Sequence, residues 1–104
     1  MTSIRYYKSP RITKLDGRFK FYNRGFKYRV SFNTQGNYDP YSTALKWCQN
    51  TYGPEYTWDD AVAWTRKIWN NDWRVMIPPK NKWWREIYLR DEQAVTMLLL
   101  VIGG

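Results

Sequence analysis

The chain has 104 residues, 43% of them hydrophobic and 25% charged, a net charge of +8, one cysteine and no histidine. This length supports one domain, and the composition excludes disordered and collagen-like chains. A lone cysteine excludes an internal disulfide, and without histidine it cannot build a zinc site. Since a glycine-rich phosphate loop and a serine elbow are also absent, we expect no enzymatic activity, no cofactor and no metal.

The positive charge is concentrated in the first third of the chain. Residues 1–32 contain nine Lys or Arg and one acid, whereas residues 33–104 contain eight basic and eight acidic side chains. Like charges crowded into a short segment destabilise the compact state unless an anion offsets them. We therefore expect this part of the chain to contact a polyanionic partner.

Residues 1–15 carry a basic side chain at every third position from residue 5 onward. This spacing fits neither a strand nor an amphipathic helix. We expect an extended basic arm that orders on binding, followed by one α+β domain over residues 16–104; the alternative is an ordinary frayed terminus. The cations of the arm are Arg5, Lys8, Arg11 and Lys14.

Residues 18–32 alternate between apolar and basic side chains on both sides of a turn at residues 23–25. This pattern predicts a β-hairpin. We expect no nearby acid to offset its basic face, and we favour an anion-binding surface over the alternative of edge protection. The inward face would hold Phe19, Phe21, Phe26, Tyr28, Val30 and Phe32, and the outward face Arg18, Lys20, Lys27 and Arg29.

Residues 39–52 are a predicted helix, because Asp-Pro opens the segment and Gly-Pro closes it. One face of this helix carries Tyr41, Ala44, Leu45, Cys48 and Tyr52, which places the cysteine in the core. Residues 57–69 allow two interpretations. The spacing of Thr57 and Asp60 favours a helix start, whereas the β-branched and aromatic residues of 64–69 favour a strand.

Residues 73–77 and 83–89 alternate as two strands around a loop at 78–82. Residues 91–102 form a predicted helix with two acids at its start. This helix is apolar nearly all round, so it belongs to the core or to a subunit contact, and a homodimer through it is a candidate arrangement. The pattern predicts an α+β fold of two ββα-like units, with a four-stranded antiparallel sheet and two or three helices on one face.

A second basic and aromatic cluster precedes and opens the last predicted strand. Alternation sends its two tryptophans to opposite faces, so we expect one in the core and one exposed. An exposed tryptophan among cations suits base stacking by a single-stranded nucleic acid and suits a protein contact equally. The cluster consists of Lys80, Lys82, Trp83, Trp84 and Arg85.

Three short stretches resemble small uncharacterised proteins of tailed bacteriophages. They are Trp47-Cys48, Tyr52-Gly53-Pro54 and residues 87–94, which read as a strand running into an acidic helix start. No activity and no functional residue accompanies this resemblance. It implies a protein that binds a host macromolecule in the host cytoplasm, or a minor virion component.

Together these patterns predict a small, non-enzymatic, cytoplasmic protein that engages a polyanion, with nucleic acid as the leading partner. The outward hairpin cations would contact phosphates, and the arm would wrap around the nucleic acid. Trp83 or Trp84 would stack on a base or anchor the partner. The alternative is a phage-encoded module that inhibits or regulates an acidic host protein, or a virion part. We expect no membrane partner, because the longest apolar stretch, residues 94–102, is too short to span a bilayer.

Overall fold

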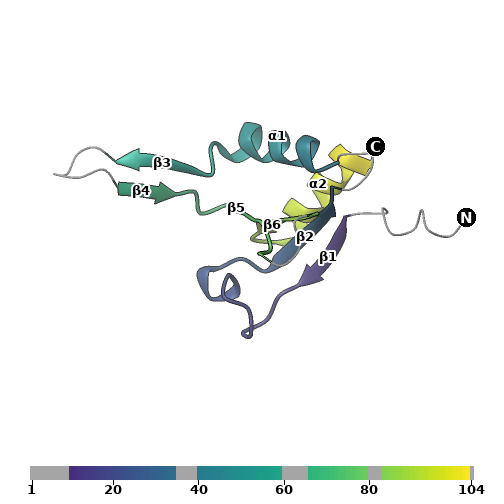
Figure 1. Cartoon of the computed structure of the whole chain (residues 1–104), viewed down its shortest axis with the longest axis horizontal. Coiled ribbons are helices and arrows are strands. Elements are labelled where there is room, and N and C mark those ends of the chain that lie inside the picture. Colours follow the sequence, from purple (N-terminus) through teal and green to yellow (C-terminus); the bar gives the residue numbers. More distant parts are fainter. Residues whose placement is uncertain (1–9, 35–39, 60–65, 80–82, 104) are drawn as a thin grey trace, which may run out of the picture.

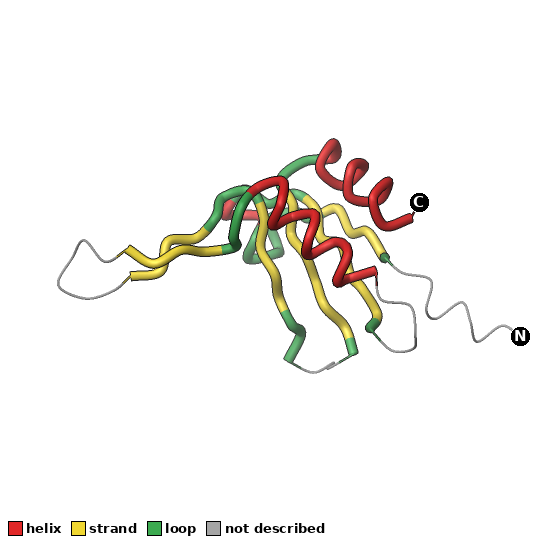
Figure 2. The backbone as a smooth tube through the Cα atoms, turned by 90° about the horizontal axis from the view of Figure 1, so that it is seen from above, coloured by secondary structure: helices red, strands yellow, loops and turns green. Residues whose placement is uncertain are grey.

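The computed structural model describes residues 10–34, 40–59, 66–79 and 83–103. Four antiparallel strands form one sheet in the order β1-β2-β6-β5, and two helices cover one of its faces (Figures 1 and 2). A separate two-stranded hairpin projects from one end of the molecule. The predicted α+β class is therefore confirmed. The elements are β1 (Arg11–Lys14), β2 (Tyr28–Asn33), α1 (Pro40–Tyr52), β3 (Tyr56–Asp59), β4 (Arg66–Trp69), β5 (Trp73–Met76), β6 (Trp84–Leu89) and α2 (Glu92–Gly103).

The main core lies between the sheet and the two helices. Alternate residues of the central strands, such as Val30 and Ile87, face the helices and are fully buried. Cys48 of α1 and Leu98 of α2 meet them there. The predicted helical face of residues 39–52 is thus confirmed for the described residues 40–52, and Asp39 lies outside them. The helix ends where predicted, at Gly53, whose φ of +90° suits glycine.

The opposite face of the sheet is covered in part by residues 15–27. Leu15 and Phe26 are buried against Tyr88 of β6, and the Phe21 ring lies 4.3 Å from the Tyr88 ring. A short 3-10 turn at Tyr22–Arg24 folds this segment back onto the sheet. The predicted first strand of the N-terminal hairpin, residues 18–22, is therefore wrong. Its phenylalanines cover Tyr88 instead of pairing with β2.

The strand that pairs with β2 is β1, which sequence analysis assigns to the extended arm. Arg11 lies opposite Ser31 and Lys14 opposite Tyr28. Because these residues are hydrogen-bonded into the sheet, the arm assignment is wrong for residues 11–14. Residues 1–9, with Arg5 and Lys8, lie outside the described residues.

Residues 56–69 form a β-hairpin in their described part, so the helix interpretation of residues 57–69 is wrong. The alternative, a strand at 64–69, is confirmed for Arg66–Trp69. Tyr56 lies directly opposite Trp69, with ring centroids 5.5 Å apart. Cross-strand aromatic pairs of this kind stabilise a hairpin, and they outweigh the weak capping signal of Thr57.

Candidate functional site

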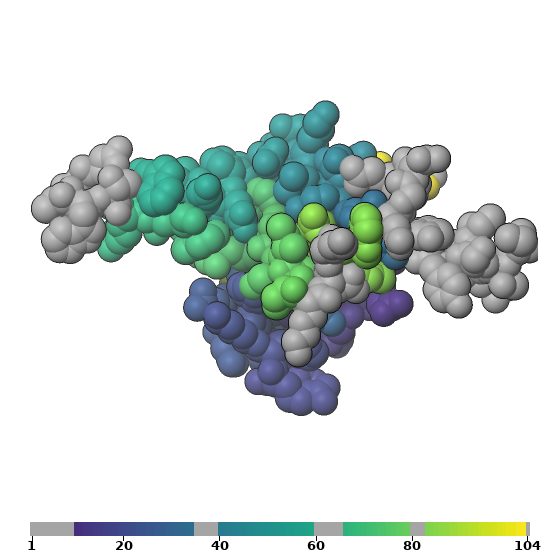
Figure 3. All heavy atoms as spheres, in the orientation of Figure 1, coloured from purple at the N-terminus to yellow at the C-terminus, as the bar shows by residue number. Residues whose placement is uncertain are grey.

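Most cations of residues 10–34 gather on the side of the sheet opposite the helices, whereas Lys14 lies opposite Tyr28 on the helix side. Residues 15–27 pack on Tyr88, and Tyr88 alternates with the helix-facing residues of β6, so this segment carries its side chains away from the helices. In Figure 1 it lies on one side of the sheet with α1 on the other, and in Figure 3 it forms the purple-blue lower lobe. We call this side the basic surface; it comprises Arg11, Lys20, Arg24, Lys27 and Arg29.

A polar groove of about 290 Å³ crosses the basic surface beside β1. The Arg11 guanidinium of β1 lies 5.2 Å from the ring centroid of Trp84. Trp84 belongs to β6, which is separated from β1 by β2. Arg29 and Glu86 also line the groove, with a distance of 3.7 Å between the Arg29 Nε and a carboxylate oxygen. The groove therefore combines two guanidinium groups, one carboxylate and one indole face.

Two acids lie among these cations, which corrects the prediction that none would. Asp16 accepts hydrogen bonds of 3.0 and 2.9 Å from the Arg18 guanidinium, and these bonds lower the pKa of Asp16. Glu86, the second acid, comes from β6, so only folding brings it to Arg29. Lys20 has no carboxylate partner among the described residues, and Lys27 lies over the Tyr22 ring at 4.4 Å.

Glu86 also accepts a 3.0 Å hydrogen bond from the hydroxyl of Tyr88. Burial and the adjacent Glu86 carboxylate raise the pKa of Tyr88 to about 12. The tyrosine thus stays a neutral donor at physiological pH and orients the carboxylate that faces Arg29. Glu86 offsets part of the positive charge of the groove and fixes its geometry.

The second predicted cluster divides between the two sides of the sheet. Trp84 is half-buried in the groove and Trp83 is 45% exposed, so the expectation that one of them enters the core is wrong. Arg85 alternates to the opposite face and donates to the Trp84 carbonyl at 2.9 Å. The structure therefore groups Trp84 with Arg11 and Arg29 and separates it from Arg85. Lys80 and Lys82 lie outside the described residues.

The projecting hairpin holds an aromatic cluster that sequence analysis did not select. Its strand register places Tyr56, Trp58, Lys67 and Trp69 on one face. The sequence does contain a pattern that indicates this cluster, because aromatic residues two positions apart, at 56 and 58, share one face of a strand. This pattern was missed because residues 57–69 were interpreted as a helix.

Two further findings concern the described residues alone. No group of three metal-ligating side chains lies close together within them. None of the helices seen there has the length and apolar character needed to cross a membrane.

No family model, curated protein or solved structure matches this chain.

Proposed function

We propose that this protein is a non-enzymatic, cytoplasmic nucleic-acid-binding protein that contacts phosphates through the basic surface. One observation carries the proposal. Among the described residues, five cations of the first third lie at the helix-free face of the sheet, where Arg11, Arg29 and Trp84 line a groove. The charge is therefore presented as a surface of defined shape.

The chemistry of these side chains fits a phosphate backbone. A guanidinium group donates two parallel hydrogen bonds to a phosphate, and lysines add point charges around it. Each neutralised phosphate releases condensed counterions, which drives binding at low salt. The half-buried indole of Trp84 adds an aromatic face at the edge of the groove.

The first test is the salt dependence of binding to a labelled oligonucleotide. If the five cations of the basic surface neutralise phosphates of a single strand, log K falls with log salt with a slope of roughly −3.5. A slope near zero with both single-stranded and duplex probes would overturn the proposal.

A matched pair of variants locates the contact. Lys20→Gln removes an exposed cation from the basic surface and should reduce the steepness of the slope by about 0.7 to 0.9. Lys46→Gln removes the same charge from the exposed side of α1 and should leave the slope unchanged. Equal effects of the two substitutions would argue against the basic surface as the interface.

The alternative functions, an inhibitor or regulator of an acidic host protein and a virion component, use the same cations for a protein contact. Capture experiments from host lysate with and without nuclease separate them from the main proposal. Bound material that disappears with nuclease treatment supports nucleic acid, whereas one discrete protein that persists contradicts it.

A further inference from the structure

The β3–β4 hairpin extends away from the body of the molecule (Figure 2), and its two faces differ in chemistry. One face, here called the aromatic face, consists of Tyr56, Trp58, Lys67 and Trp69. The other face carries the hairpin's described carboxylate, Asp59, which pairs with Arg66 at 3.3 Å. The aromatic face is therefore cationic and the opposite face is internally neutralised.

The rings of the aromatic face stand on edge to one another and remain accessible. Tyr56 packs at 81° to Trp58 and at 65° to Trp69. Trp58 is 56% exposed and Trp69 is 39% exposed. The Lys67 ammonium lies 4.2 Å from the Tyr56 centroid, 4.8 Å from that of Trp69 and 5.5 Å from that of Trp58.

Stability alone accounts for only part of this cluster. A two-stranded hairpin is marginal in water, and the directly opposed pair of Tyr56 and Trp69 supports it. Trp58 contributes less, because it leaves more than half of its surface in solvent and lies opposite Lys67. Large exposed aromatic residues on a projecting element are typical of a contact surface.

Arg74 of β5 connects the aromatic face to the basic surface. Its guanidinium lies 4.3 Å from the Trp69 centroid and 5.9 Å from that of Phe26, which belongs to the segment covering the helix-free face. Burial first, and the nearby charge of Arg24 second, lower the pKa of Arg74, whereas the Glu55 carboxylate acts in the opposite direction. The charges of Arg74 and Arg24 repel each other where the hairpin joins the sheet, and Glu55 offsets part of this repulsion; an additional anion such as a phosphate would stabilise the pair further.

We propose that the aromatic face stacks the bases of a single-stranded nucleic acid, whose phosphates continue past Arg74 onto the basic surface. This inference rests on the proposed function and names its substrate class as an unpaired strand. A duplex hides its base faces within the stack, whereas a single strand offers them to aromatic side chains. Cations beside exposed rings match a ligand that alternates bases with phosphates.

The position of Lys67 is compatible with this role. An exposed cation over a ring is held more weakly than a stacked base. A base therefore displaces the ammonium from the rings, and the flexible lysine side chain moves to an adjacent phosphate.

The test compares fluorescence anisotropy of labelled oligothymidine of about 15 nucleotides with that of a duplex of equal length. We expect Trp58→Ala to weaken binding of the single strand about tenfold and to leave duplex binding unchanged. Trp58→Phe keeps an aromatic ring and should retain most of the affinity. Ile68→Ala, on the opposite face of the same hairpin, is the control and should change neither affinity.

The outcomes separate this inference from the proposed function. Unchanged single-strand binding by Trp58→Ala, or an equal loss for both probes, overturns the stacking role and leaves phosphate binding by the basic surface standing. If the wild-type protein binds neither probe at low salt, the proposed function itself fails. Circular dichroism of each variant confirms that the fold is retained.

Discussion

At the scale of single residues, burial decides which side chains are chemically available. Cys48 sits on the buried face of α1 and is fully inaccessible. Burial raises the pKa of its thiol to about 12, so the reactive thiolate is not populated near neutral pH. Tyr88 is protected in the same way beneath residues 15–27.

The first residue-scale prediction concerns thiol reactivity. A thiol-specific reagent at neutral pH should leave Cys48 of the native protein unmodified and should label it fully in denaturant. The measurement is the mass of the protein after a short exposure. Rapid labelling of the native state would contradict the burial of this residue.

The buried Cys48 thiol and Tyr88 hydroxyl also make the stability of the protein depend on pH in the alkaline range. The unfolded Cys48 thiol ionises near its ordinary pKa of 9.0, whereas the native thiol keeps its proton until about 12. Because only the unfolded state loses this proton between those values, the free energy of unfolding falls as pH rises above 9.0. Denaturant titrations should give a lower free energy of unfolding at about pH 10 than at about pH 8. Cys48→Ala should make this difference smaller. Above its ordinary pKa of 10.0, Tyr88 lowers the free energy of unfolding further in the same way.

At the scale of elements, the local sequence pattern was sufficient to predict most helices and strands of the main sheet. Alternation predicted β5 and β6, and caps predicted α1 and α2. The hairpin β3–β4 was ambiguous, because its sequence satisfies both a capping pattern and a strand pattern. Pairing of Tyr56 with Trp69, thirteen positions along the chain, resolves this ambiguity. The first strand was misplaced because its true residues, 11–14, carry basic side chains and only one apolar side chain, Ile12.

The cap of α2 gives a prediction at this scale. The Asp91 carboxylate accepts a 2.9 Å hydrogen bond from the backbone N–H of Ala94. Asp91→Ala should lower the free energy of unfolding by about 1 kcal/mol, which corresponds to about 4–8 °C in Tm for a domain of this size. Asp91→Ser, which keeps a capping oxygen, should lose much less; equal Tm values for the two variants would contradict a capping role.

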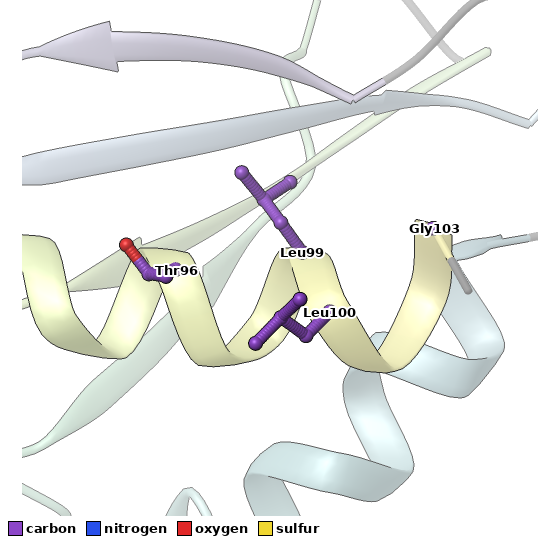
Figure 4. Close-up of a pocket in the computed structure, with 4 residues that line it drawn as sticks. All are labelled: Thr96, Leu99, Leu100 and Gly103. Atoms are coloured by element: carbon purple, nitrogen blue, oxygen red, sulfur yellow. The ribbon is translucent and has the colours of Figure 1, made fainter.

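At the scale of the whole molecule, the two sides of the sheet have separate roles. The helix side builds the main core, and the other side carries the basic surface. The helix α2 leaves apolar side chains in solvent, including Met97 and Leu100, the latter 67% exposed. Figure 4 shows Leu99 and Leu100 leaving α2 in different directions beside a shallow apolar pocket lined by these residues, Thr96 and Gly103.

Light scattering after size-exclusion chromatography tests the candidate homodimer through α2. A dimer through α2 would give a mass of twice 12.7 kDa for the wild type and a monomer for Leu100→Glu, because a carboxylate cannot be buried unpaired in an apolar contact. Thr43→Glu adds the same charge to an exposed position of α1 and serves as the control. A monomeric wild type would reject the dimer.

The sequence by itself determined the fold class, both helices, three of the four sheet strands and the excess of cations in the first third. These follow from local periodicity, caps and composition, which act over a few neighbouring residues. Only the tertiary structure decided where those cations point, that Glu86 offsets Arg29, and that Arg11 and Trp84 share one groove. It alone also joined the aromatic hairpin to the basic surface through Arg74. Such groupings depend on strand register and on which face each segment covers, and distant parts of the chain set both.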